Sequence, residues 1–200
     1  MRKKSHISLA GQMMNSLEVE GILNHRMTFY LGNILPDCKP SFLTTPHSFD
    51  ETFAEIGRKM ETLVSSFDVS RGMTMAKTLR IGEVTHYIAD YFTFPHNKHY
   101  DGSLKDHCCY EGDLKRRLKE YIDSGRAMIL KGSIQISDTV EDLLTYIKEH
   151  HQEYMSRKRC IKDDMDYIIT VCTSVLASLI SMCCRLTEEL IKRPKYVFAS

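Results

Sequence analysis

The stretch HYIADYFTFPHNKHYDGSLKDHCCYE, residues 86–111, contains the most informative pattern in this chain. His86 and Asp90 are four residues apart, and so are His107 and Glu111. Side chains at this spacing project from one face of an α-helix, one turn apart. The stretch therefore predicts two helices, each presenting a histidine and a carboxylate that can converge on a common centre.

Pro95 lies between the two pairs and is expected to end the first helix near Phe94. His96 then lies at the corner, where its imidazole can reach both pairs. Imidazole nitrogens and carboxylate oxygens together are typical ligands of a hydrolytic zinc site. Surface histidines and acids on solvated helices are the alternative, and one such pair alone would be weak evidence. Two pairs with a histidine between them favour a metal site.

The rest of the first helix supports this interpretation. Its face opposite His86 is apolar, so that face can pack in a core while the ligand face lines a cleft. The apolar residues are Ile81, Val84, Ile88 and Phe92.

Helical periodicity extends along most of the chain. Helices are expected over residues 8–27, 50–67, 72–94, 104–122, 138–155 and 163–193, with Asp50 and Asp138 as N-caps. Only residues 129–136 could pair locally as a strand. No internal repeat is present. The pattern predicts an all-α fold, with residues 1–200 forming a single helical-bundle domain.

Composition limits the class of protein. Two hundred residues with 42% hydrophobic content can bury a substantial core. Seven cysteines, an odd number, favour reduced thiols and a cytoplasmic location over a secreted disulfide framework. The basic start MRKK is followed by polar sequence, so no export signal is expected. The net charge is only +1, and the basic residues are scattered along the chain and not collected in one stripe. The sequence therefore gives no electrostatic reason to expect a nucleic-acid partner.

Residues 167–184, YIITVCTSVLASLISMCC, carry no charge over a length at the lower limit for a membrane span. The segment also contains five serines and threonines, and its apolar stripe continues past its end into charged sequence. These features favour a buried core helix, with a membrane helix as the alternative.

Three further residues could join a metal cluster. Asp37 follows Pro36 at a chain reversal, His47 lies in a predicted loop, and His6 precedes the first helix. Each is weak alone, because loop histidines and turn aspartates are usually solvated. The adjacent His150 and His151 lie in a charged helix and are expected to face solvent.

Five motifs together resemble one family, the zinc-dependent phospholipases C, whose all-α fold is related to that of P1-type nucleases. The resemblance covers residues 5–114, and the spacing of its second half is the most specific part. The motifs are SHISLAG (5–11), LGNILPD (31–37), TPHSFD (45–50), THYIADYFTFPH (85–96) and HCCYE (107–111).

The resemblance implies a cluster of zinc ions that cleaves phosphodiesters. Carried over by motif, one zinc would be held by Asp37, His47, His86 and Asp90, and a second by His96, His107 and Glu111. A third would be held by His6 together with a bridging Asp90. Secreted members complete the third site with a terminal tryptophan, whereas this chain contains no tryptophan and starts at Met1. Two zinc ions are therefore predicted, and the third is left open.

Metal-assisted hydrolysis is the mechanism that these ligands would support. Asp37 is the candidate for orienting or deprotonating the attacking water. Glu83 is an alternative for that role or a partner of a ligand histidine. The expected substrate is a small phosphodiester or a phospholipid, and the oligomeric state is left open. The competing hypothesis is a non-catalytic helical protein that is stabilised by the metal or binds a phosphorylated ligand. It is less favoured because structural zinc sites are usually rich in cysteine.

Overall fold

The computed structural model describes residues 1–17, 24–39, 46–129, 133–157 and 160–192, and within these ranges every regular element is helical. The helices are α1 (Lys3–Leu17), α3 (Arg26–Ile34), α4 (Phe49–Ser65), α5 (Met75–Tyr91), α6 (Leu104–Asp123), α7 (Arg126–Ile129), α8 (Val140–Ser156) and α9 (Ile161–Lys192), with two short 3-10 turns, η1 (Pro36–Cys38) and η3 (Phe94–His96). The prediction of an all-α fold is confirmed.

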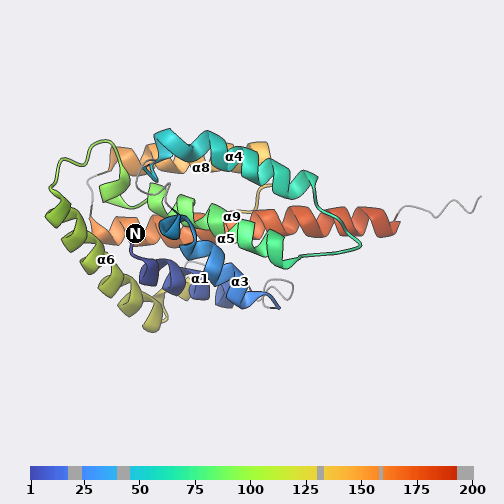
Figure 1. The fold of residues 1–200 in the computed structure, drawn as a ribbon, viewed down its shortest axis with the longest axis horizontal. Helices are drawn as coiled ribbons and strands as arrows, with labels where there is room; N and C mark the ends of the chain where they lie inside the picture. The colour runs from blue at the N-terminus through green and yellow to red at the C-terminus, as the bar shows by residue number, and fades with distance from the viewer. Residues whose placement is uncertain (18–23, 40–45, 130–132, 158–159, 193–200) are drawn as a thin grey trace, which may run out of the picture.

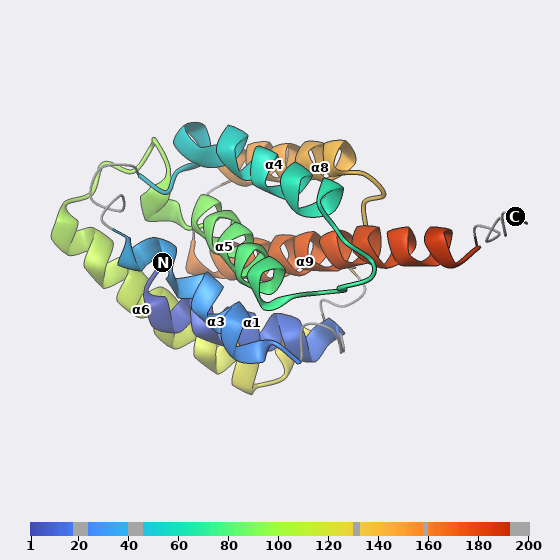
Figure 2. The same ribbon diagram turned by 45° about the vertical axis from the view of Figure 1, so that its right-hand side comes forward.

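The helices are arranged around α5 and α9, which lie in the middle of the molecule (Figures 1 and 2). Helices α4 and α8 run along one side of this pair, and α1, α3 and α6 lie on the other side. The apolar face predicted for α5 is part of the core, because Ile81, Val84, Ile88 and Phe92 are all fully buried. Burial of this face orients the opposite face of α5 toward α1 and α3.

Helices α3 and α5 approach so closely that their crossing requires glycine. A Cβ atom on Gly32 would lie 2.2 Å from the carbonyl oxygen of Leu79, and one on Gly82 would lie 2.6 Å from that of Phe29. Neither position has room for a side chain, since the obstructing atoms belong to backbone. The close contact places His86, one turn beyond Gly82, directly beside α3.

Helix α9 supplies much of the core. Residues 161–187 form one helix that is long and apolar enough to cross a membrane, but 83% of its apolar window is buried inside the protein. Its polar residues have partners in the fold: the Ser174 hydroxyl accepts from the backbone N–H of Gln135, and the Ser178 hydroxyl from that of Ser137. These features are those of a buried core helix.

Several predicted helix ends need correction. The helix expected over residues 8–27 is instead α1, starting at Lys3, followed after a turn at residues 24–25 by α3; residues 18–23 lie outside the described part of the chain. The N-caps are Ser48 and Thr139, not Asp50 and Asp138. The Thr139 hydroxyl accepts the N–H of Asp142, so the cap lies one residue later than predicted.

The stretch 129–136 does not form a strand in its described residues, since Ile129 ends α7 and residues 133–136 run as turn and coil; residues 130–132 are not described. Instead, the backbone N–H of Gln135 in this stretch donates a hydrogen bond to the Ser174 hydroxyl of α9. The prediction that His151 faces solvent is wrong, because this side chain is buried, stacks on Phe49 and bonds to Asn97.

Candidate metal centre

All eight predicted metal ligands lie at one end of the bundle. Seven of them form two compact groups, and within each group one possible ligand atom per residue lies within 4.8 Å of all the others. The first ligand group is Asp37, His47, His86 and Asp90, and the second ligand group is His96, His107 and Glu111. The eighth, His6, packs against the first ligand group.

The first ligand group joins three separate parts of the chain. Helix α5 supplies His86 and Asp90, the turn η1 supplies Asp37, and the residues before α4 supply His47. The Nε2 atom of His86 lies 3.1 Å from Nδ1 of His47 and 3.3 Å from Oδ2 of Asp90. Oδ1 of Asp37 lies 3.6 Å from the same Nε2 atom. Four potential donors therefore face one point.

The tautomer of His86 follows from its other nitrogen. Nδ1 of His86 lies 2.8 Å from the carbonyl oxygen of Asn33 in α3. A carbonyl can only accept, so Nδ1 carries the proton, and in the neutral ring the lone pair of Nε2 points into the group. A histidine that donates its second nitrogen to a carbonyl is the usual arrangement of a metal ligand. The close crossing of α3 and α5 sets up this hydrogen bond.

The second ligand group joins η3 to α6. Oε1 of Glu111 lies 3.1 Å from Nε2 of His96 and 3.1 Å from Nε2 of His107. The capping box of Ser103 and Asp106 fixes the start of α6, so His107 and Glu111 occupy its first two turns. Pro95 forms the corner that turns His96 toward them, as predicted from the sequence.

The nitrogen of Met1 lies between the two groups. It is 2.5 Å from Oδ1 of Asp90, 2.9 Å from Nε2 of His96 and 3.2 Å from Oε1 of Glu111. Met1 is buried, as are Ser5 and His6 of α1, whereas Lys3 and Lys4 of the same helix are exposed. Sequence reasoning missed this donor, because no local pattern brings residue 1 to residue 90.

His6 is fully buried and stacks on His86, with 3.9 Å between ring centroids. Its Nε2 lies 3.4 Å from Oδ1 of Asp90, but neither ring nitrogen makes a hydrogen bond within the described part of the chain. A buried imidazole without a hydrogen bond is costly. A metal ion coordinated by His6 would remove that cost.

Burial has the largest effect on the pKa values of His6, Asp90 and Asp37. Burial lowers the pKa of His6 to about 3, so its imidazole is neutral, as a metal ligand must be. Burial would raise the pKa of Asp90, but electrostatic interactions with His96, the Met1 nitrogen and the neighbouring histidines outweigh it and hold that pKa well below its usual value. Burial raises the pKa of Asp37, and the charge of Asp90 adds to the increase.

The donor set fits zinc. It combines imidazoles with carboxylates, it includes a buried histidine whose nitrogens make no hydrogen bond to the described residues, and His86 is oriented by a carbonyl on its far side. All seven cysteines lie in the part of the chain that the structure describes, and none of them forms a disulfide or belongs to either ligand group. Histidine and carboxylate ligands without cysteine are more common in catalytic than in structural zinc sites.

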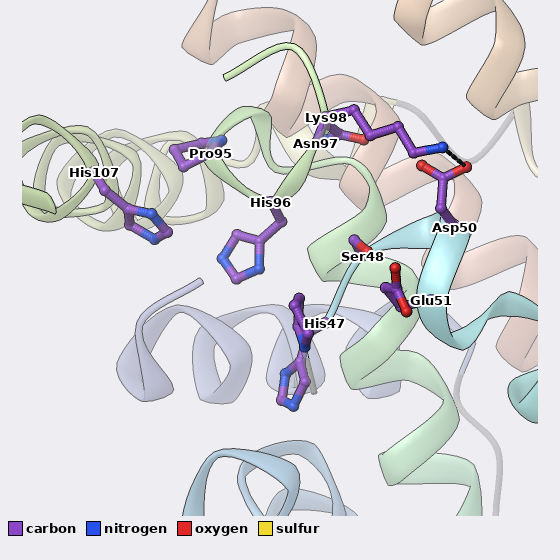
Figure 3. Close-up of a pocket in the computed structure, with 10 residues that line it drawn as sticks. His47, Ser48, Asp50, Glu51, Pro95, His96, Asn97, Lys98 and His107 are labelled. Carbon is purple, nitrogen blue, oxygen red and sulfur yellow. Dashed lines mark ion pairs between the residues drawn. The ribbon is translucent and has the colours of Figure 1, made fainter. Parts of the chain in front are cut away.

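Two open pockets adjoin the centre. One, of about 370 Å³, is lined by His47, His96 and His107 together with Asp50, Glu51 and Lys98. Figure 3 shows these three histidines around one space, with the Lys98–Asp50 ion pair at its edge. The other, of about 660 Å³, is lined by Asp37, His96, His107 and Glu111 and by the first turn of α1. Both ligand groups therefore contribute residues to open pockets.

The two candidates for the base differ in position. Asp37 is in the first ligand group and lines the larger pocket. Glu83 lies about two turns before Asp90 on α5, where its Oε1 accepts from the ammonium of Lys39 at 2.5 Å, and it lines neither of the two pockets beside the centre. The position therefore favours Asp37.

Asp164 of α9 supports the second ligand group from behind and was missed by sequence reasoning. Its carboxylate accepts the backbone N–H of Phe94 at 3.0 Å, the Tyr110 hydroxyl at 2.9 Å and the Tyr154 hydroxyl at 2.8 Å. Phe94 lies two residues before His96, and Tyr110 directly precedes Glu111. Burial raises the pKa of Asp164 to about 6.

The fold and the centre define an all-α protein with a histidine–carboxylate site that could hold metal. Comparison with known families identifies the family: the family model described as zinc dependent phospholipase C matches residues 5–161. The chain belongs to this family, and the resemblance seen in the motifs is confirmed. No curated protein and no solved structure gave a significant match.

Proposed function

We propose that this protein hydrolyses phosphodiesters, with small phosphodiesters or phospholipids as substrates, at a multinuclear zinc centre. The observation that carries the proposal is the convergence of seven donors in two adjacent groups, both open to pockets. Family membership supports the same chemistry. A purely structural metal site would need no such access from solvent.

Each of the two ligand groups would hold one zinc ion. Asp37, His47, His86 and Asp90 would hold one zinc, and His96, His107 and Glu111 a second. His6 and Asp90 would contribute to a third, with the nitrogen of Met1 as a further donor where the chain begins at that residue. When bound, the zinc ions bind phosphoryl oxygens and lower the pKa of a coordinated water.

Asp37 is proposed to orient and deprotonate the attacking water. It lines the larger pocket, where its carboxylate can accept a proton from a water molecule. The water oxygen bonds to phosphorus as one ester P–O bond breaks. The products are an alcohol and a phosphomonoester, with the water's proton on Asp37 and a solvent proton on the alcohol.

Metal content is the decisive measurement. We expect protein purified without chelator to contain two to three zinc per chain by elemental mass spectrometry, and to hydrolyse a 4-nitrophenyl phosphodiester. The double variant His86→Ala, His107→Ala should lose both properties. His25→Ala, His99→Ala is the matched control, because neither histidine belongs to a ligand group.

Folded wild-type protein with less than one metal ion per chain would contradict the proposal. Metal without hydrolysis of any diester would favour the non-catalytic alternative instead. The cytoplasmic location stays a prediction, which fractionation of cells expressing the full chain would test.

A further inference from the structure

The larger pocket beside the metal centre has a strongly basic wall. The pocket is lined by residues of both ligand groups, by residues 1–4, and by Leu104, Cys108 and Lys115 of α6. The basic residues of this wall are Arg2, Lys3, Lys4 and Lys115. Helices α1 and α6 lie against each other at this end of the molecule (Figures 1 and 2). The wall is therefore adjacent to the proposed reaction site.

The charges of this pocket do not balance. Apart from the four basic side chains, its charged lining includes two carboxylates, Asp37 and Glu111, and both are proposed metal ligands. Bound cations would offset the charge of those two carboxylates. The basic side chains would then make the pocket strongly positive, which favours an anionic ligand.

One of the four cations is held in place. The guanidinium of Arg2 donates to the carbonyl oxygen of Cys108 at 2.8 Å. It passes directly over Gly112, where an added Cβ would lie 3.3 Å from its nitrogen. Within the described residues, Lys3, Lys4 and Lys115 form no ion pair. Their ammonium groups are therefore available to a ligand.

Neighbouring charges elsewhere are neutralised. The next pocket along α6 also contains Arg116 and Lys119, but Arg116 pairs with Asp113 and Glu120, and Lys119 pairs with Asp123. The other pocket beside the metal centre contains Asp50 and Glu51 against a single Lys98. Uncompensated positive charge is thus concentrated on one side of the centre.

We propose that this basic wall binds a phosphate monoester on one arm of the substrate, so that the protein prefers phosphodiesters carrying a second phosphate. The inference rests on the proposed function, since the wall matters to catalysis only if the neighbouring centre cleaves a diester. The smaller pocket, which contains Asp50 and Glu51 against Lys98, would hold the other arm of the substrate, either uncharged or cationic. The second phosphate would sit against Lys4 and Lys115.

The test uses matched probes. Propyl phosphate and 1,3-propanediol bisphosphate are titrated by calorimetry into zinc-loaded and metal-free protein, and both are measured as inhibitors where activity is present. Two 4-nitrophenyl diesters of glycerol, without and with a terminal phosphate, are compared as substrates. Wild-type protein should favour the doubly phosphorylated member of each pair by roughly tenfold, a typical effect of one charge-assisted contact.

The variant Lys4→Gln, Lys115→Gln should lose most of this preference, while zinc content stays unchanged. Lys105→Gln, Lys148→Gln carries the same charge change on exposed residues that do not line the pocket, and should keep it. The preference should also weaken at high salt, because the lysines are solvent-accessible.

Equal binding of the two phosphates by wild-type protein, or equal losses in the two double variants, would overturn the proposal. Lysine-dependent binding to vesicles of anionic lipid without any preference for the bisphosphate would overturn it as well, and would assign the wall to a membrane surface. Binding to metal-free protein is informative even if no diester is cleaved, so failure of the subsite and failure of the hydrolase proposal are distinguishable.

Discussion

At the scale of single residues, Asp90 is the centre of the site. Its buried carboxylate lies within 4 Å of the Met1 nitrogen, His47, His86 and His6, and 3.8 Å from His96. A buried carboxylate needs such partners, because desolvation of an isolated charge is very costly. One residue therefore links the two ligand groups, which is what a bridging ligand would do.

A second buried aspartate provides the residue-scale prediction. In Asp164→Asn, the amide –NH₂ cannot accept hydrogen bonds, so at least one of the donors from Phe94, Tyr110 and Tyr154 loses its acceptor. We expect zinc affinity of the second ligand group to fall by roughly 10- to 100-fold, the usual cost of losing support behind a ligand. Zinc titration followed by elemental analysis measures this.

The neighbouring Asp163→Asn is the control, since Asp163 accepts from the exposed Cys160 and from none of these three donors. Equal loss of zinc from both ligand groups in Asp164→Asn would show that the residue acts on overall folding and does not position η3 and α6.

At the scale of elements, the site depends on how closely the helices pack. The α3–α5 crossing places the Asn33 carbonyl against His86, and it exists because Gly32 and Gly82 have no side chains. Helices α4 and α8 are joined to the turn that carries His96 through His151, which stacks on Phe49 and bonds to Asn97. Packing between helices, more than any single loop, orients the ligands.

Gly82→Ala tests the crossing. Its new methyl group would collide with the Phe29 carbonyl at 2.6 Å, so α3 and α5 must separate. We expect a loss of roughly 2–3 kcal/mol in the free energy of unfolding, as for other overpacked sites. Zinc binding should also weaken, because His86 loses its carbonyl partner. Denaturant unfolding and zinc titration measure the two effects.

Gly57→Ala in α4 is the matched control. Its new methyl would meet only the flexible end of Leu144, at 3.3 Å, and alanine favours helix over glycine by about 1 kcal/mol. That variant should be neutral or stabilised. Similar destabilisation in both variants would contradict the account of the crossing.

His151 predicts a pH dependence of stability. Burial lowers its pKa from 6.5 to about 4, despite the opposing charge of Asp50. Between these values the unfolded chain binds a proton that the folded protein does not, so stability falls as pH falls from 6.5 to 4. The difference between the two pKa values of His151 corresponds to a loss of roughly 3 kcal/mol in the free energy of unfolding, at 1.36 kcal/mol per pKa unit.

Replacement by Gln removes the titrating group, so the stability of His151→Gln relative to wild type should rise on acidification. Denaturant unfolding at pH 7 and pH 4.5 measures this. The neighbouring His150→Gln should follow wild type, since His150 is only half-buried. A constant difference between His151→Gln and wild type at the two pH values would contradict the prediction.

At the scale of the whole molecule, the metal centre brings together segments that are far apart in the sequence. Its donors come from α1, η1, the residues before α4, α5, η3 and α6, so metal ions held there would join segments between residues 6 and 111. Ligands that bind only the folded state stabilise it by mass action. Metal and fold should therefore be coupled.

Removal of zinc by a chelator should lower the midpoint of thermal unfolding. Binding at 1,000 times the dissociation constant adds about 4 kcal/mol, so a shift of roughly 10 °C is expected for a chain of this size. Calorimetry of protein before and after dialysis against chelator measures the shift, and re-addition of zinc should restore it. The double variant His86→Ala, His107→Ala should be insensitive to chelator. An unchanged midpoint in wild type would show that the centre holds no stabilising metal.

The sequence alone was enough to predict the helical class, the apolar face of α5, the break at Pro95 and the ligand motifs. These features depend on local periodicity and on the chemistry of single residues, which can be read along the chain. The convergence of the two ligand groups was expected from the family resemblance. Helix ends were predicted less well, because neighbouring polar residues such as Ser48 and Asp50 compete for the same cap.

Only the tertiary structure decided the contacts between distant residues. It placed the Met1 nitrogen beside Asp90, buried Asp164 behind Phe94, paired Glu83 with Lys39, and assembled the basic wall from α1 and α6. The physical reason is that these contacts are set by the packing of whole helices, whose crossing points depend on side-chain volumes summed over the core. No local pattern in the sequence records that sum.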